Sequence, residues 1–203
     1  WGAEKKLYGF LKTGGKTYCF LGKAADFASC GVEKARQTSL SVTAFSTDCE
    51  FEAGDVKLKI RFISPLPPQN FELLSLPVCY MEYETEGAEE SELSFFINRR
   101  IAYNDIGEPC DRSVRGGVLE LNGFESAFLG LTRQLPLPNN DDAVGADWGY
   151  FYLSGESAYL LDETDLAGYL AGGFKEFASA GEERYLGSIN RAPSGVVMVA
   201  YDD

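Results

Sequence analysis

The chain has 203 residues and a formal net charge of −13, and it contains no histidine. Hydrophobic residues make up 45% and aromatic residues 13% of it, which predicts a packed core rather than a disordered chain. The acidic balance argues against binding to nucleic acid or an anionic membrane, because both require a basic surface. No apolar run approaches the roughly 20 residues of a membrane-spanning helix.

The first predicted strands form a hairpin. Leu7–Leu11 and Lys16–Leu21 are apolar segments on either side of Thr13-Gly14-Gly15, which has the composition of a tight turn. Two further strands are expected at Thr38–Phe45 and Cys49–Ala53, and they precede the clearest strand of the chain.

That strand is Val56–Ile63, where apolar and cationic residues alternate strictly. Alternation with period two places one set of side chains on each face of a sheet. The apolar residues, expected to face the core, are Val56, Leu58, Ile60 and Phe62, and the cationic residues are Lys57, Lys59 and Arg61.

A proline-rich connection follows. Ser64–Pro68 cannot continue the strand, because proline lacks the N–H that a ladder needs. The apolar segment Leu73–Val78 then leads into another strand, and Pro77 within it should mark a strand start or a bulge. The spacing of Pro65 and Pro68 also fits a P-x-x-P ligand, although prolines more often shape a loop.

The second half predicts more strands and one helix. Thr164–Ala178 has apolar residues at helical spacing, with Asp162 or Thr164 as its cap, and Gly172-Gly173 should shorten or kink it. We therefore predict an all-β fold, with residues 1–203 forming one large antiparallel β-sandwich or super-sandwich with one short helix. The remaining predicted strands are Val78–Thr85, Leu93–Ile97, Gly117–Leu121, Trp148–Leu153, Arg184–Ile189 and Val196–Tyr201.

The absence of histidine limits the chemistry. It removes Ser-His-Asp and Cys-His catalysis, and no phosphate-binding glycine motif is present, so we predict no cofactor and no metal site. Carboxylates remain as candidate general acids or bases. Asp147, Asp141-Asp142 and Asp202-Asp203 are the candidates, although Asp147 is more simply explained as a ligand of backbone N–H groups where a strand begins.

Six residues are candidates for binding a ligand or a neighbouring domain. Trp148, Tyr150 and Tyr152 would share one strand face, as an exposed stacking surface or as a row in the core. Arg99 and Arg100 could hold a carboxylate, or be a solvated pair at a sheet edge. Asp147 completes the set.

The five cysteines are Cys19, Cys30, Cys49, Cys79 and Cys110. Their odd number and the absence of C-x-x-C spacing argue against a complete disulfide framework or a zinc cluster, and they favour a cytoplasmic setting. Cys19 and Cys79 lie in apolar strands and are expected to be buried thiols. Cys110 lies in a polar loop and is expected to react quickly.

Six short motifs, in this order, resemble the β-rich N-terminal region of glutaminase A type multidomain proteins. The usual helical C-terminal region is absent, and the family's histidine-containing loop appears here as Glu86–Glu92 without histidine. The motifs are Gly15–Gly22 (GKTYCFLG), Phe51–Gly54 (FEAG), Phe62–Pro65 (FISP), Leu74–Tyr80 (LSLPVCY), Asp147–Leu153 (DWGYFYL) and Ala200–Asp203 (AYDD).

The resemblance implies a parent hydrolase that deamidates glutamine, with its catalytic groups in an α-helical domain that follows the sandwich. Because the chain begins at Trp1, we expect a fragment of such a protein, namely a non-catalytic accessory domain that packs against the α-helical domain of the same parent. One alternative is a sugar- or small-ligand-binding module of a glycosidase-like enzyme, with a concave aromatic-lined site. Another is a self-sufficient hydrolase with two carboxylates in a deep pocket.

Overall fold

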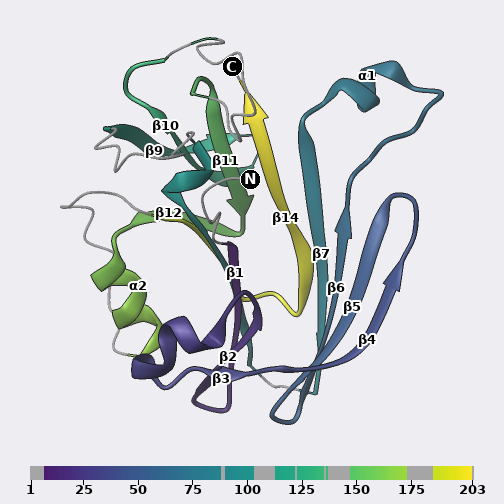
Figure 1. Ribbon diagram of the computed structural model, residues 1–203. Coiled ribbons are helices and arrows are strands. Elements are labelled where there is room, and N and C mark those ends of the chain that lie inside the picture. The colour runs from purple at the N-terminus through teal and green to yellow at the C-terminus, as the bar shows by residue number, and fades with distance from the viewer. Residues whose placement is uncertain are drawn as a thin grey trace.

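The computed structural model describes residues 7–87, 90–102, 113–121, 123–134, 136, 147–172 and 185–202. Most of these residues belong to strands (Figure 1). The strands are β1 (Leu7–Thr13), β2 (Lys16–Leu21), β3 (Glu33–Lys34), β4 (Arg36–Val42), β5 (Ser46–Ala53), β6 (Val56–Ile63), β7 (Val78–Glu86), β8 (Glu92–Asn98), β9 (Val114–Leu121), β10 (Phe124–Leu131), β11 (Tyr150–Gly155), β12 (Ser157–Leu161), β13 (Tyr185–Asn190) and β14 (Ser194–Asp202). The helical segments are η1 (Ala24–Cys30), α1 (Phe71–Ser75), η2 (Arg99–Ala102) and α2 (Glu163–Leu170).

The strands form two packed sheets. One has six strands in the order β12-β13-β8-β1-β2-β3, and the other has eight in the order β4-β5-β6-β7-β14-β11-β10-β9. Neighbouring strands run antiparallel except for β2 and β3, which run parallel. The prediction of an all-β antiparallel sandwich with one short helix is confirmed, with the five-residue α1 as an addition.

The main hydrophobic core fills the space between the sheets. Leu58, Phe95, Leu129 and Leu153 are each fully buried there. Val56 and Ile60 join them, while the cations between them on β6 are exposed. The predicted facing of β6 is therefore confirmed, except that Phe62, near the end of the strand, is only partly buried.

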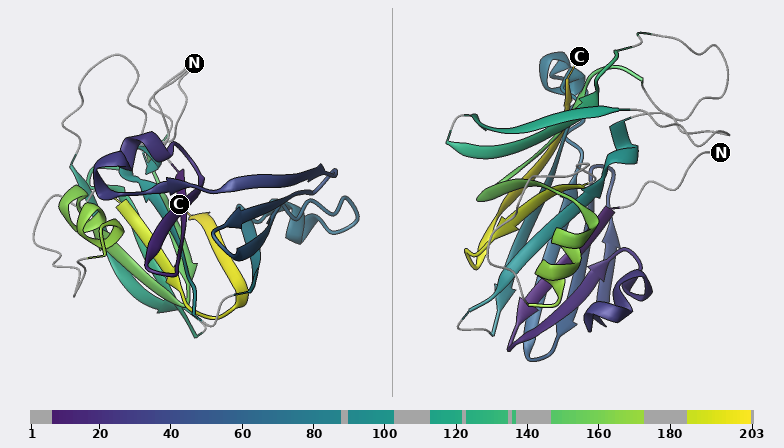
Figure 2. Two further views of the ribbon diagram at one scale, coloured as in Figure 1. Left: turned by 90° about the horizontal axis from the view of Figure 1, so that it is seen from below. Right: turned by 90° about the vertical axis from the view of Figure 1, so that its left-hand side faces the viewer.

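A second, smaller core lies where α2 packs on the six-stranded sheet (Figure 2). The Asp162 side chain caps α2 by accepting a hydrogen bond from Asp165 N–H at 2.8 Å. Leu166 and Leu170 are buried against the sheet. The helix ends before Gly172, which has a left-handed φ of 78°, and the remainder of the predicted helix lies outside the described residues.

Lys12 on β1 contacts Tyr169 on α2 in two ways. Its Nζ lies 3.3 Å from the centre of the Tyr169 ring and donates a hydrogen bond to the Tyr169 carbonyl oxygen at 2.6 Å. The Tyr169 hydroxyl in turn donates to Glu92 at 2.8 Å. Burial lowers the pKa of Lys12 to about 8, and the nearby Glu92 carboxylate opposes that shift. These contacts couple the helix to the hairpin beneath it.

The eight-stranded sheet extends beyond its partner on the side of β4 to β7 (Figures 1 and 2). Leu40, Val42, Phe62 and Cys79 lie on the core-facing side of these strands by register, yet none of them is buried. We call this region the overhang. It makes the prediction of a buried Cys79 wrong, because the thiol lies beyond the cover of the six-stranded sheet.

Three strands have no counterpart among the predicted strands, namely β10, β12 and the two-residue β3. The pair Asn122-Gly123 is a hairpin turn sequence and signals the β9–β10 hairpin, where Gly123 has a φ of 84°. Apolar Leu73–Leu76, expected to lead into a strand, instead lies in and beside α1. Strand β7 begins directly after Pro77, which confirms the expectation that this proline marks a strand start.

Substitutions on β6 test the two faces. Leu58→Ala should lower the free energy of unfolding by about 2–5 kcal/mol, because it leaves a cavity at a fully buried site. Lys57→Ala, one residue away on the exposed face, should change it by no more than about 0.5 kcal/mol. Urea unfolding followed by circular dichroism measures both values. Similar losses for the two variants would contradict the assigned facing.

Candidate functional site

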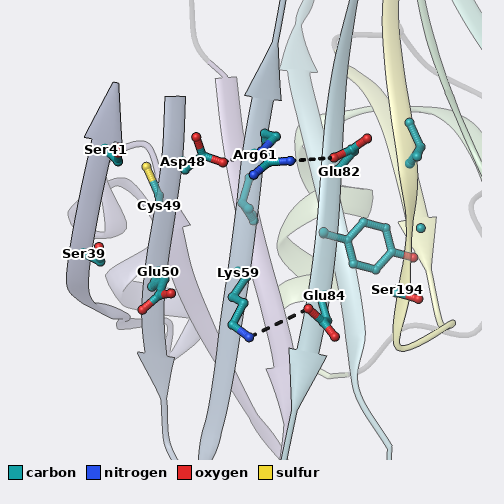
Figure 3. A pocket seen from close by; sticks show the side chains of 14 residues that line it. Ser39, Ser41, Asp48, Cys49, Glu50, Lys59, Arg61, Glu82, Glu84 and Ser194 are labelled. Atoms are coloured by element: carbon teal, nitrogen blue, oxygen red, sulfur yellow. Dashed lines mark hydrogen bonds and ion pairs between the residues drawn. The ribbon is translucent and has the colours of Figure 1, made fainter. Parts of the chain in front are cut away.

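The outer face of the eight-stranded sheet carries a polar trough across β4, β5, β6, β7 and β14 (Figure 3). Its volume is about 790 Å³. Strand register places ten lining side chains on this one face, because residues opposite each other on neighbouring strands point the same way. They are Ser39, Ser41, Asp48, Glu50, Lys59, Arg61, Glu82, Glu84, Ser194 and Val196.

The charges in the trough form two rows, each with a cation on β6 between acids on β5 and β7. In one row Arg61 pairs closely with Asp48 and lies 3.7 Å from Glu82. The Arg61 hydrogen bond lowers the pKa of Asp48 below its usual value. Arg61 therefore stabilises the charged form of the Asp48 carboxylate.

In the second row, Lys59 on β6 lies between Glu50 on β5 and Glu84 on β7. Lys59 lies 3.8 Å from Glu84 and makes a hydrogen bond of 2.6 Å to Glu86, outside the trough. In the part of the chain that the structure describes, the ion pairs of Glu82 and Glu84 are longer than 3.5 Å, so their oxygens retain capacity to accept hydrogen bonds.

Tyr150 and Tyr152 of the predicted aromatic row lie on the same sheet face, on the far side of β14 from β7. Tyr150 and Tyr152 are partly exposed and contact the ring of Phe128, with ring centres 5.8 and 5.9 Å away. The Arg115 guanidinium lies over Tyr150, 5.1 Å from its centre. These two tyrosines lie neither in the core nor in the polar trough.

Trp148 and Asp147 form the turn that precedes β11, so this strand begins two residues later than predicted. Gly149 turns the chain with a φ of 78°, and its N–H donates to the Gln134 side chain. The Tyr201 hydroxyl donates to the Trp148 carbonyl oxygen at 2.7 Å. Asp147 is buried, with 1% of its surface exposed. The contacts described for this motif hold the turn in place.

Arg99 and Arg100 lie apart from these aromatic residues, in η2 after β8 of the six-stranded sheet. Arg100 N–H donates to the Asn98 side chain at 3.0 Å. The structure therefore does not gather the six candidate residues into one site. Asp141, Asp142 and Asp203 lie outside the described residues, and Asp202 ends β14 opposite Tyr150.

An apolar surface surrounds the β6–β7 connection, which the proline pattern had marked only as a loop. Its exposed fractions are large, from 37% at Leu74 to 78% at Phe71. No side chain of α1 is buried. We call this connection the apolar arm, and its exposed apolar residues are Leu66, Phe71, Leu73, Leu74 and Leu76. Such a concentration of exposed apolar side chains is typical of an interaction surface.

The arm continues into an apolar groove on the overhang. The groove has a volume of about 500 Å³ and is lined by Phe45, Phe62, Leu66 and Cys79 among others. A hydrogen bond of 2.9 Å from Ser64 N–H to the Phe45 carbonyl oxygen joins the base of the arm to the β4–β5 turn. The arm and groove therefore form one apolar surface.

The described residues contain neither a candidate metal site nor a candidate membrane-spanning helix. No group of three or more His, Cys, Asp and Glu side chains there could hold a metal ion. No helix in that part of the chain is long and apolar enough to cross a membrane.

The fold and these surfaces define the class of protein: a β-sandwich domain with a polar trough and an extended apolar surface. A family model described as "Domain of unknown function (DUF5127)" matches residues 45–182, and the chain belongs to this family. The chain is also similar to a protein named Glutaminase A from Aspergillus oryzae, with 22% identity over 169 residues. That match covers 81% of this chain but only 22% of the Aspergillus protein.

The cysteines provide a test of the overhang. Cys79 is exposed, whereas Cys19 is buried and burial raises its pKa to about 11. Native-state alkylation at pH 8 should modify Cys19 at least about tenfold more slowly than Cys79, because burial shields the Cys19 thiol from the reagent and its raised pKa lowers its thiolate fraction. Peptide mass spectrometry after short labelling gives both rates, with unfolded protein as control.

Comparable rates for the two native thiols would contradict this assignment. Cys110, for which fast reaction is expected from sequence, lies outside the described residues.

Proposed function

We propose that this chain is a non-catalytic accessory domain of a glutaminase-like hydrolase, and that its apolar arm packs against an α-helical catalytic domain of the same polypeptide. The observation that carries the proposal is the apolar arm with its adjoining groove. Burying one leucine or phenylalanine side chain stabilises a complex by about 1.5–3 kcal/mol, so leaving five exposed is unfavourable unless a partner covers them.

The relative supports the same arrangement. This chain spans about a fifth of the length of the protein named Glutaminase A that it resembles, which leaves most of that protein free to form further domains. The absence of histidine makes a self-sufficient hydrolase the weakest of the three hypotheses.

The experiment uses the proposed α-helical domain of the parent polypeptide, produced separately from this chain. The two should bind each other, and glutamine should release ammonia only with the second polypeptide or the complex. Phe71→Ala and Leu73→Ala should each weaken binding by about ten- to hundredfold, because each loses a buried apolar side chain. Isothermal titration calorimetry measures the affinities.

Val118→Ala is the matched control, since Val118 is similarly exposed at 49% but lies on β9, away from the arm. It should bind as the wild type does. Glutamine turnover by this chain alone would overturn the non-catalytic role. Unchanged binding by both arm variants would overturn the docking surface.

The polar trough favours a second candidate function, which is binding of a sugar or another small polar ligand. Its carboxylates and hydroxyls can accept and donate hydrogen bonds, but the aromatic residues of β11 do not line it. This differs from the aromatic-lined site expected of a sugar-binding module. The trough therefore supports a polar ligand more than one that stacks on an aromatic ring.

An NMR titration with glucose and glucosamine tests this second function. Amide shifts should concentrate at Arg61, Glu82 and Ser194, and Arg61→Ala should abolish them. Arg115→Ala, on the other half of the same sheet face, should leave them unchanged. An absence of shifts at about 10 mM sugar, enough to detect a millimolar Kd, would exclude binding of these sugars.

A further inference from the structure

Strand β4 is an edge of the eight-stranded sheet, and the register shift in its pairing with β5 lies near its start, between Gln37 and Ser39. The strand pairs with β5 on one side, and within the described residues no strand pairs with its other side (Figures 1 and 2). All seven of its residues are exposed. From Gln37 to Phe45 the chain has no charged residue and no proline. Sheet edges of globular proteins usually carry such residues, because they prevent pairing with another strand.

The register shows which backbone groups face outward. Thr43 N–H donates to the Ser46 carbonyl oxygen at 2.8 Å, so these residues form a hydrogen-bonded pair of the hairpin. Hydrogen-bonded pairs alternate along an antiparallel ladder, so Ser41 also directs its N–H and C=O toward β5. Leu40 and Val42 therefore direct their N–H and C=O groups away from β5, toward the open edge of the sheet.

The same two residues present apolar side chains. Leu40 is 61% exposed and Val42 is 69% exposed, and both lie on the core-facing side of the overhang. An incoming strand would satisfy their outward N–H and C=O groups and cover their side chains at once.

We infer that the occupant of this edge is a second copy of the chain, paired antiparallel with β4 about a twofold axis at Ser41. In this register Leu40 of each copy forms hydrogen-bonded pairs with Val42 of the other. The four apolar side chains then lie together on one face, and the two Ser41 residues lie opposite each other at a non-hydrogen-bonded position.

The absence of charge favours this occupant over a strand of different sequence. The paired segments contain no ionised side chain, so no like charges meet directly despite the net charge of −13 on each copy. Charges farther away than about 8 Å are largely screened at physiological ionic strength. In this register the backbone groups of Leu40 pair with those of Val42 in the other copy, and those of Val42 pair with those of Leu40. Each copy therefore contributes the same surface, as an isologous contact requires.

Cross-linking tests the register. Ser41→Cys places two thiols opposite each other, with Cα atoms about 4.5 Å apart, which is within the range for a disulfide. Mild oxidation should therefore give a covalent dimer. Ser39→Cys, two residues away on the same face, should give at least about tenfold less, because its opposite residue is Thr43 of the other copy. Both variants contain the same native cysteines, so cross-links through those appear equally in both.

A charge substitution tests assembly without a cross-link. The mass measured by light scattering should rise toward twice that of one chain between about 1 μM and 1 mM, the range expected for a small interface. Ser41→Lys should abolish the rise, because two ammonium groups would face each other at the axis. The introduced lysine lies opposite Asp48 in its own hairpin, so folding should be preserved. Ser39→Lys, opposite Glu50, is the matched control and should still assemble.

Hydrogen exchange adds a readout at single residues. The amides of Leu40 and Val42 should become at least about tenfold more protected at high protein concentration, while Ser41 is protected throughout. A mass that stays at one chain at every concentration would overturn the proposal. Equal cross-linking of the Ser41→Cys and Ser39→Cys variants, or a dimer that survives Ser41→Lys, would overturn it as well.

Discussion

The strict alternation of β6 is the constraint on which the eight-stranded sheet depends. If β6 shifted by one residue against its neighbours, Lys57, Lys59 and Arg61 would lie in the core and the apolar residues of β6 would face water. The register of β6 against β5 and β7 is therefore fixed. The acids of those two strands reinforce this register on the outer face through cross-strand ion pairs. The exposed pairs contribute little stability individually, but their positions follow directly from the core. The charged rows of the polar trough are therefore a consequence of one alternating strand.

The sequence predicts features that depend on local periodicity, and fails where a neighbour decides the outcome. The facing of β6 and the start of β7 after Pro77 follow from patterns within a few residues. The sequence offered Asp162 or Thr164 as the cap of α2, and the structure shows Asp162. Cys79 lies on the core-facing side as its strand pattern requires, but its exposure depends on how far the opposite sheet extends. The hairpin formed by β9 and β10 had a readable signal at Asn122-Gly123, whereas Tyr150 and Tyr152 had none to show which sheet face they occupy.

The two faces of the eight-stranded sheet differ in how they meet solvent. On the outer face, each exposed cation of β6 has acidic neighbours, so that surface is stable in water without a partner. On the inner face, the overhang and the apolar arm expose large apolar side chains that no described residue covers. Apolar Leu73–Leu76 gives the same signal in sequence as a buried strand, because periodicity reports hydrophobicity and not what covers it. The candidate surface was therefore visible in sequence only as a proline-rich connection and an apolar segment leading into a strand.

The difference in width between the two sheets explains why these exposed features occur in the same half of the domain. Six strands cannot cover eight, so the inner sides of β4 to β7 extend past β1 and β2. The core-facing side chains of these strands are apolar, but beyond β1 and β2 no strand of the other sheet covers them. A sheet in this condition can be completed in two directions: across its face, by an element packed on the groove and arm, or along its plane, by a strand added at β4. The first uses side chains and the second uses the backbone of Leu40 and Val42, so the two modes of association can be separated by substitution.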